Sequence, residues 1–95
     1  MLIIILKNFK PYFIRIQITR DVREYDLIAI SAGFDHHEKD WGGLLKTEDY
    51  FTIGKWSKEF SHQHCQGKRF GVLEGGYNHT VLGRNVKSFL QGFSD

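Results

Sequence analysis

Two short apolar runs, separated by a segment of helical periodicity, constrain the fold of this chain more than any other feature. The first run, residues 26–31 (Asp-Leu-Ile-Ala-Ile-Ser), has no polar-apolar alternation and is followed by Ala-Gly. Such a run is typical of a strand that is buried on both faces in a parallel sheet. The second run, residues 69–74, ends at a pair of glycines. The two runs therefore predict neighbouring parallel strands joined by a helix.

The segment between the two runs predicts a helix from Thr47 to about Cys65. Thr47 is placed as the N-cap, and the two acids that follow suit the first turn, where the helix dipole favours negative charge. Apolar residues recur at intervals of three and four and predict one buried face, which comprises Tyr50, Ile53, Trp56 and Phe60.

A last helix is predicted after the second strand, with Asn78 as its N-cap. Its predicted apolar face comprises Leu82, Val86, Phe89 and Leu90. Gly83 weakens this helix by about 1 kcal/mol relative to alanine. The chain is thus expected to be an α/β protein with a βαβα core.

The N-terminal part carries conflicting signals. Tyr12, Ile14, Ile16 and Ile18 alternate as in a strand, whereas the position ahead of a buried strand favours a helix. We therefore expect an extra N-terminal helix or strand. The apolar run of residues 2–6 is too short to span a membrane, which takes about 20 residues, and it lacks the flanking features of a signal peptide.

Composition narrows the classes of function. A chain of 95 residues forms one small domain at most. Its 13 Lys and Arg against 11 Asp and Glu leave a net charge of +2. A charge this small predicts neither nucleic acid nor a membrane surface as a partner, because those sites need clustered cations. The lone Cys65 cannot form an internal disulfide, so the cytoplasm is the expected compartment.

Side chains that can bind a metal ion crowd the segment after the first predicted strand. In open α/β sheets, ligands bind beyond the carboxyl ends of the strands. Residues 35–40 read Asp-His-His-Glu-Lys-Asp, a composition suited to Zn²⁺ or another divalent ion. In an extended segment, Asp35 and His37 would point the same way and could reach one ion. The alternative is a solvated loop that caps residues 41–43.

The segment after the second predicted strand presents an aromatic hydroxyl behind two glycines. Gly75 and Gly76 allow the backbone to approach a ligand closely, and Tyr77 follows them directly. A tyrosine hydroxyl can donate a hydrogen bond to a developing oxyanion without carrying charge itself. The alternative is a tight turn in which Tyr77 packs its ring.

Together, residues 31–37 (Ser-Ala-Gly-Phe-Asp-His-His) and residues 73–78 (Leu-Glu-Gly-Gly-Tyr-Asn) resemble two signature segments of the histone deacetylase and acetylpolyamine amidohydrolase superfamily. The similarity extends over residues 25–93 and matches residues 1–24 poorly. It implies that residues 1–95 form a single partial domain, the C-terminal portion of an arginase-like parallel sheet. It also implies a zinc-dependent deacetylase that acts on acetyl-lysine or an acetylated polyamine.

The resemblance assigns roles to individual residues. Asp35 matches an aspartate ligand of the family's zinc ion. Tyr77 matches the tyrosine that hydrogen-bonds the substrate carbonyl and stabilises the oxyanion of the tetrahedral intermediate. Gly75 and Gly76 match the glycine run that shapes the acyl pocket.

Other residues of the first segment match positions without catalytic roles. His37 and Asp40 match loop positions for which a structural role is expected. In the family that this sequence resembles, the Asp-x-His zinc pair and the tandem-histidine base belong to upstream segments, and this sequence does not contain those segments. His36 and His37 are therefore expected to be neither the base nor a zinc ligand.

The count of ligands predicts that this chain is inactive alone. A catalytic zinc site needs about three protein ligands, and Asp35 is one. The strands also leave exposed sheet edges, which favour pairing with a missing N-terminal half or a full-length relative. The alternative is a non-catalytic α/β interaction module, or a split-gene remnant, that pairs with another chain.

Overall fold

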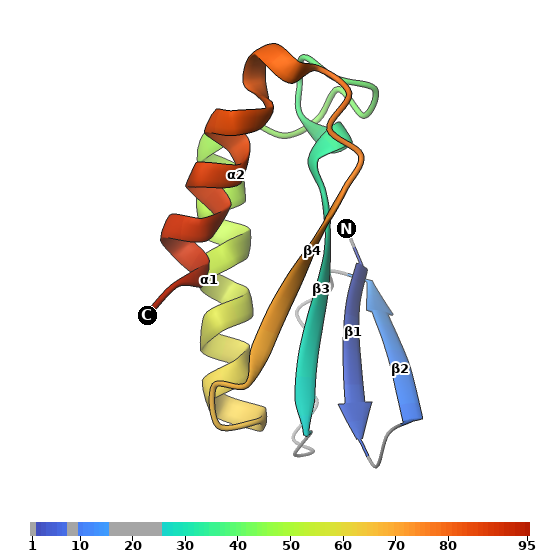
Figure 1. The fold of residues 1–95 in the computed structure, drawn as a ribbon, viewed down its shortest axis with the longest axis vertical. Coiled ribbons are helices and arrows are strands. Elements are labelled where there is room, and N and C mark those ends of the chain that lie inside the picture. The colour runs from blue at the N-terminus through green and yellow to red at the C-terminus, as the bar shows by residue number, and fades with distance from the viewer. Residues whose placement is uncertain (1, 8–9, 16–25) are drawn as a thin grey trace.

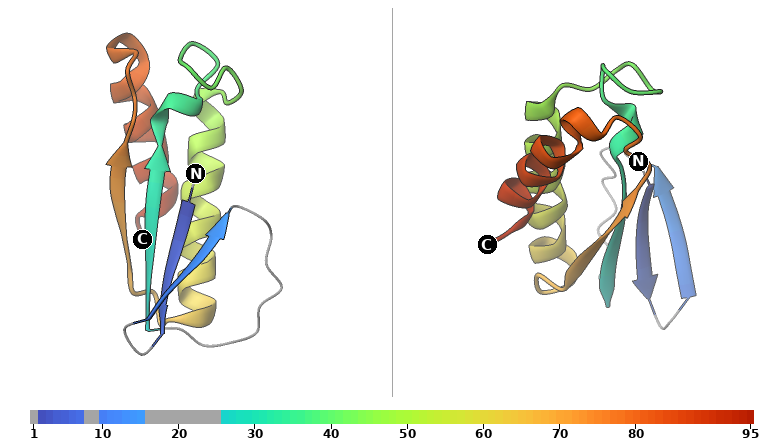
Figure 2. Two further views of the ribbon diagram at one scale, coloured as in Figure 1. Left: turned by 90° about the vertical axis from the view of Figure 1, so that its right-hand side faces the viewer. Right: turned by 45° about the horizontal axis from the view of Figure 1, so that its top comes forward.

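The computed structural model describes residues 2–7, 10–15 and 26–95, with side chains for residues 26–95. The elements are β1 (Leu2–Lys7), β2 (Lys10–Arg15), β3 (Leu27–Gly33), the 3-10 helix η1 (Phe34–His36), α1 (Thr47–His64), β4 (Arg69–Glu74) and α2 (His79–Phe93). The strands form one sheet in the order β2-β1-β3-β4 (Figure 1). Both helices lie on the same side of this sheet (Figure 2).

The predicted βαβα core is confirmed, because β3 and β4 pair in parallel with α1 between them and α2 after them. The extra N-terminal structure consists of strands rather than a helix, since β1 pairs antiparallel with β3, and β2 with β1. Of the alternating residues, Ile16 and Ile18 lie outside the described residues. Pro11 lies in β2, at the edge of the sheet, where its missing N–H removes no ladder bond from an inner strand.

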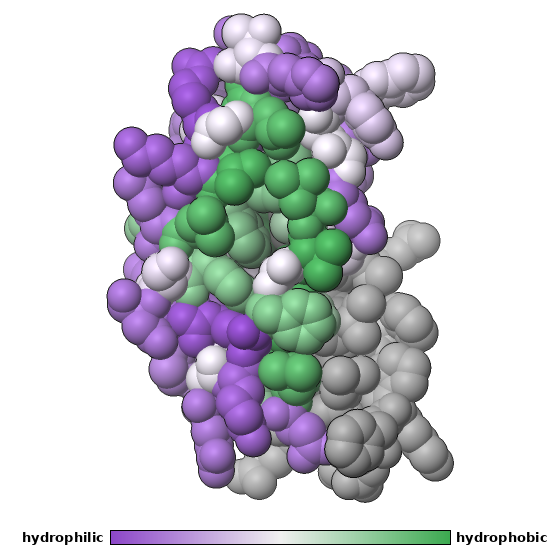
Figure 3. All heavy atoms as spheres, in the orientation of Figure 1, coloured by the Kyte–Doolittle hydropathy of each residue, from purple (hydrophilic) through white to green (hydrophobic). Residues whose placement is uncertain are grey.

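The hydrophobic core lies between β3 and the two helices. β3 is buried from Ile28 to Gly33, as expected of its apolar run. The core cluster comprises Ile28, Ile30, Ala32, Phe34, Tyr50, Ile53, Cys65 and Phe89. By contrast, β4 is largely exposed. Figure 3 shows apolar side chains gathered over α2 and β4 around a hollow.

The helices α1 and α2 approach each other closely through two glycines. A Cβ added at Gly54 would overlap the carbonyl oxygen of Phe89, and one added at Gly92 would overlap the carbonyl oxygen of Phe51. The backbones therefore touch where both side chains are missing.

Neither described helix is long and apolar enough to cross a membrane.

This close packing changes the buried faces that the sequence predicts. Trp56 is 49% exposed and Leu90 is 48% exposed, so their placement in the core was wrong. Ser57 and Ser61 occupy the buried face of α1 instead. Their hydroxyls donate to carbonyls of their own helix, at 2.8 Å and 2.6 Å, which satisfies them in the interior.

The helix starts agree with the sequence in one case and differ in the other. Asn78 is the N-cap of α2, and its Oδ1 accepts a hydrogen bond from the N–H of Thr80 at 3.1 Å. The N-cap of α1 is Lys46 rather than Thr47, so that prediction was wrong. The backbone N–H of Lys46 donates to Oδ2 of Asp49 at 2.7 Å, and this bond replaces the expected threonine cap.

Candidate functional site

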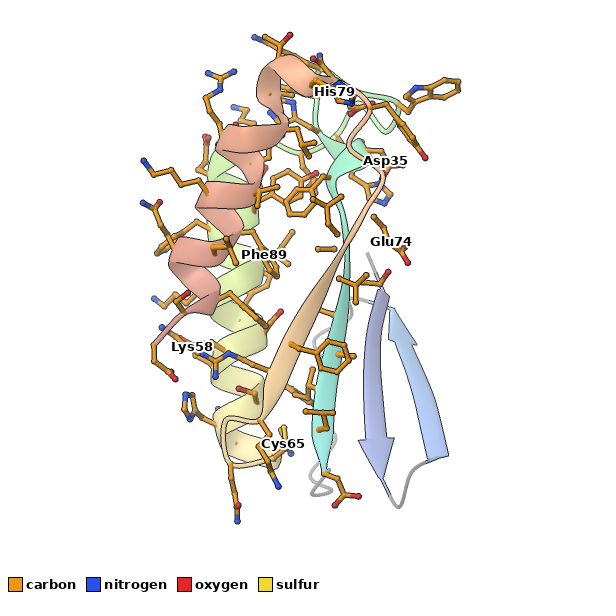
Figure 4. All side chains as sticks on the ribbon, in the orientation of Figure 1. Asp35, Lys58, Cys65, Glu74, His79 and Phe89 are labelled. Carbon is orange, nitrogen blue, oxygen red and sulfur yellow. The ribbon has the colours of Figure 1, made fainter. Side chains whose placement is uncertain are left out.

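The parallel pairing of β3 with β4 brings the two predicted site segments to the same end of the sheet. Gly33, the last residue of β3, pairs with Glu74, the last residue of β4. Asp35 follows the first of these strand ends by two residues, and Tyr77 follows the second by three. Figure 4 shows Asp35 and Glu74 at this end of the sheet. The Asp35 carboxylate lies against the backbone of Gly75, where an added Cβ would be 2.5 Å from Oδ1 of Asp35.

Asp35 is positioned by the anchoring of the residues before it. The Phe34 side chain is buried in the core, where its ring stacks on Tyr50 with centroids 5.0 Å apart and meets Phe89 edge-on at 5.9 Å. The Tyr50 hydroxyl donates a hydrogen bond to the carbonyl of Gly33 at 3.1 Å. These contacts fix η1, and they leave the Asp35 side chain half-buried at the end of the sheet.

His37 lies in the interior and binds protein groups through both ring nitrogens. Nδ1 accepts a hydrogen bond from the N–H of Lys39 at 3.1 Å, and Nε2 lies 3.3 Å from Oγ1 of Thr47. An accepting Nδ1 leaves the ring proton on Nε2, so Nε2 donates to Thr47. The Thr47 hydroxyl in turn donates to Oδ1 of Asn85 at 2.8 Å. His37 thus fastens the loop after β3 to α1 and α2.

Asp40 joins the loop after β3 to the loop after β4. Its Oδ2 accepts from the N–H of Asn78 at 2.9 Å, and its Oδ1 accepts from the N–H of Trp41 at 2.7 Å. The hydrogen bond from Asn78 is the main cause that lowers the pKa of Asp40 below its ordinary value. Asp40 is therefore a carboxylate at neutral pH.

Tyr77 stands on the surface beside an exposed tryptophan. Its side chain is 64% exposed, and its ring lies edge-on to Trp41 with centroids 6.3 Å apart. An open depression of about 430 Å³ is lined by Lys39, Asp40, Trp41, Tyr77 and Asn78. Gly75 and Gly76, just before Tyr77, have φ values of +64° and +82°, which suit glycine and little else.

The described residues supply one candidate zinc ligand at this end of the sheet. Within the described part of the chain, no three His, Cys, Asp or Glu side chains gather closely enough to hold a metal ion. A catalytic zinc site needs about three protein ligands. Asp35 therefore fits zinc only as one ligand among others.

Sequence reasoning missed Asn85, a fully buried residue of α2. Its Oδ1 accepts from Thr47, and its Nδ2 has no hydrogen-bond partner among the described residues. A signal was present in the sequence, because Asn85 falls at helical spacing between Leu82 and Phe89 on the apolar face. A polar residue at such a position indicates a buried hydrogen-bond network.

Comparisons with known proteins bear on this arrangement. The family model described as the histone deacetylase domain matches residues 4–93. A type-2 histone deacetylase of Dictyostelium discoideum is 51% identical over 70 residues, which are 68% of this chain and 4% of that protein. A probable deacetylase of Methanothermobacter thermautotrophicus is 38% identical over 71 residues, which are 70% of this chain and 19% of that protein.

A more distant relative is histone deacetylase HOS3 of Saccharomyces cerevisiae, which is 31% identical over 75 residues. These residues are 73% of this chain and 11% of that protein. The chain thus spans at most 19% of the length of any of these three relatives. The family match covers both strand-end segments and nearly all of the chain, and on this ground the chain belongs to the histone deacetylase family.

Proposed function

We propose that this chain is the C-terminal segment of a zinc-dependent deacetylase that hydrolyses the amide bond of acetyl-lysine or of an acetylated polyamine. The observation that carries the proposal is the contact of the Asp35 carboxylate with Gly75, two residues before Tyr77. This contact joins a candidate metal ligand to the loop of a candidate oxyanion donor. Metal-assisted amide hydrolysis uses both kinds of group. Membership of the histone deacetylase family supports the reaction class.

In this proposal each residue has one task. Asp35 contributes a carboxylate ligand, and Tyr77 donates its phenolic proton in a hydrogen bond to the oxygen that becomes negatively charged. A zinc ion held by Asp35 and further ligands would polarise the substrate carbonyl and lower the pKa of a water bound to it. Gly75 and Gly76 form the proposed wall of the acyl pocket with their backbone alone, because a Cβ at Gly75 would meet Asp35 and one at Gly76 would meet Leu82.

The chain alone is expected to have no useful deacetylase activity. Asp35 supplies one of about three zinc ligands. The histidine pair that is expected to act as the general base belongs to a segment that this sequence does not contain. A general acid–base group typically contributes about 10²–10⁴-fold to the rate, so its loss lowers activity further.

The outer edge of β4 is the surface through which we propose that the remainder of a deacetylase domain binds. β4 is the last strand in the sheet order, and among the described residues its outer edge pairs with no strand. The side chains of Phe70, Val72 and Leu73 in this strand are 44%, 48% and 54% exposed. An unpaired edge with apolar side chains favours the addition of another strand. The partner is therefore proposed to be protein rather than nucleic acid or membrane. The compartment is proposed to be the cytoplasm, because the lone Cys65 forms no internal disulfide.

A chimera tests the proposed activity. Residues 25–93 would replace the matching region of the Methanothermobacter thermautotrophicus relative, followed by measurement of bound zinc and of hydrolysis of an acetyl-lysine peptide and an acetylated polyamine. We expect an active zinc protein in which Asp35→Ala abolishes zinc binding. Tyr77→Phe should retain zinc and lower kcat by about 10²–10³-fold, the typical effect of losing one oxyanion donor.

The exposed Glu59 provides the control for this experiment, because it lies near the C-terminal end of α1, which leads into the start of β4, and Glu59→Gln should change neither zinc content nor rate. A folded chimera that binds no zinc would contradict the proposal.

A non-catalytic interaction module is the second candidate, and the exposed β4 edge favours it. Such a module would bind a full-length relative through this edge and contribute nothing to the chemistry. Co-sedimentation of the chain with that relative would then persist in Asp35→Ala and Tyr77→Phe, while the chimera would show no hydrolysis.

A further inference from the structure

The loops after β3 and β4 are held together by a pair of hydrogen bonds at Asn78. The backbone N–H of Asn78 donates to Oδ2 of Asp40 at 2.9 Å, and its side-chain Nδ2 donates to the carbonyl of Lys39 at 2.7 Å. The first bond joins two residues that are 38 positions apart in the sequence, and the second joins two that are 39 positions apart. We call this pair of contacts the Asp40–Asn78 clasp.

The clasp also fixes the start of α2. Asn78 is the N-cap of that helix, and its Oδ1 accepts from the N–H of Thr80 at 3.1 Å. The same residue therefore binds a helix of 15 residues on one side and the loop after β3 on the other. A thermal displacement of Asn78 would have to break bonds on both sides.

Tyr77 needs such a restraint because of the residues before it. Gly75 and Gly76 both have positive φ values, and glycine has the widest backbone freedom of any residue. The Tyr77 side chain is 64% exposed, so packing alone restrains it weakly. The restraint on its position comes from the residue that follows it, Asn78.

The Asp40 carboxylate is suited to this restraint because both of its oxygens accept from backbone N–H groups. Oδ1 accepts from Trp41 at 2.7 Å, and Trp41 is the residue whose ring meets Tyr77. Hydrogen bonds to an ionised acceptor are roughly twice as strong as those between neutral groups. The backbone N–H groups of Asn78, Trp41 and Tyr77, in that order, lower the pKa of Asp40, which favours the ionised carboxylate.

We propose that Asp40 is a positioning residue, which holds Tyr77 at a fixed place in the loop after β4 through its hydrogen bond with Asn78. The role of Tyr77 as a hydrogen-bond donor to the substrate rests on the proposed function. The restraint on Tyr77 rests only on the hydrogen bonds of Asn78 to Asp40 and Lys39. Productive hydrogen bonds to a developing charge require a fixed donor, because a displacement of about 1 Å can cost a large part of the rate. The clasp supplies this order before a substrate binds.

The test is NMR spectroscopy of the full 95-residue chain, which needs neither zinc nor activity. Asp40→Ala is expected to increase the hydrogen-exchange rate of the Asn78 amide by at least about tenfold, to shift its resonance upfield, and to lower the backbone order parameters of Gly75, Gly76 and Tyr77. The conservative variant Asp40→Asn keeps one acceptor oxygen and should restore part of the protection.

Asp49→Ala is the matched control, because Asp49 also accepts one backbone N–H, that of Lys46 at 2.7 Å, but within its own helix start. It should leave the Asn78 amide and the order of Tyr77 unchanged. Unchanged exchange and order in Asp40→Ala, or equal effects of Asp40→Ala and Asp49→Ala, would overturn the inference. If Asp40→Ala does not fold, the same comparison is made with Asp40→Asn. An Asn78 amide that exchanges at the wild-type rate in that variant would overturn the inference. An inactive chimera would defeat the proposed function and leave this result standing.

Discussion

At the scale of single residues, Gly75 allows the Asp35 carboxylate to lie against the backbone of the neighbouring loop. Its φ of +64° lies in the left-handed region, which costs an L-residue with a side chain roughly 1–2 kcal/mol. An alanine Cβ at this position would also lie 2.5 Å from Oδ1 of Asp35. Conformation and contact therefore both select glycine.

We expect Gly75→Ala to lower the free energy of unfolding by about 1–3 kcal/mol, as strained and overpacked substitutions do. Urea denaturation measures the change. The matched control is Gly83→Ala in α2, where nothing lies within 4 Å of the added Cβ. That substitution should raise stability by up to about 1 kcal/mol, through helix propensity. Equal effects at the two glycines would contradict this account.

Tyr50 gives a prediction with a defined pH dependence. Burial, the largest cause, raises its pKa well above the ordinary value, and its hydroxyl donates to the carbonyl of Gly33. The folded state thus favours the protonated phenol. This contribution to stability is fully present below the unfolded pKa of about 10 and is lost as the pH rises above it.

Tyr50→Phe should therefore lower stability by about 1–2 kcal/mol at pH 7, since the Gly33 carbonyl loses its phenolic partner. The variant should also lose less stability than the wild type between pH 9 and pH 11, as fluorescence-monitored urea titrations at both values would show. A parallel decline of the two proteins with pH would refute the assigned protonation.

At the scale of elements, the contact between α1 and α2 depends on Gly54 and Gly92. A Cβ at Gly92 would overlap the carbonyl oxygen of Phe51 in the facing helix. The two backbones cannot shift independently, because the core side chains of Tyr50 and Phe89 pack between the same helices and the sheet.

We expect Gly92→Ala to lower the free energy of unfolding by about 1–3 kcal/mol, even though alanine favours a helix. Thermal denaturation followed by circular dichroism measures the effect. Gly83→Ala again serves as control, since it lies in the same helix and on the exposed side. A stabilising Gly92→Ala would show that the helices are free to separate.

The sequence predicted the elements better than it predicted their faces. The buried run of β3 and the Asn78 cap carried local signals that the structure confirms. Trp56 fits the helical periodicity of α1 and yet lies half-exposed, because α2 packs against α1 at Gly54, and Ser57 and Ser61 lie on the buried face instead. Periodicity identifies a face, but which side meets a neighbour depends on how closely that neighbour can approach.

At the scale of the whole molecule, the sheet is covered by helices on one side and has an unpaired edge at β4. Gly71 faces Phe89 of α2, so strand alternation places Val72 on the side away from the helices. Val72 is 48% exposed there. An edge of this kind promotes association between chains.

We expect the isolated chain to self-associate with rising concentration, and Val72→Lys to weaken this association at least about tenfold, because a charged side chain on an edge strand opposes pairing. Analytical ultracentrifugation of both proteins measures it. The control is Gln91→Lys, which adds the same charge at an exposed position of α2. Equal association of the two variants would rule out the β4 edge.

The sequence by itself determined which segments become β3, α1, β4 and α2, because apolar runs, helical spacing and a capping asparagine act over a few neighbouring residues. It also singled out Asp35 and Tyr77 as site candidates, through motifs that can be read without coordinates. Only the tertiary structure decided that the Asp35 carboxylate touches Gly75 and that Asp40 clasps Asn78. Those contacts join residues about forty positions apart, and they follow from strand register and loop closure, which no local pattern encodes.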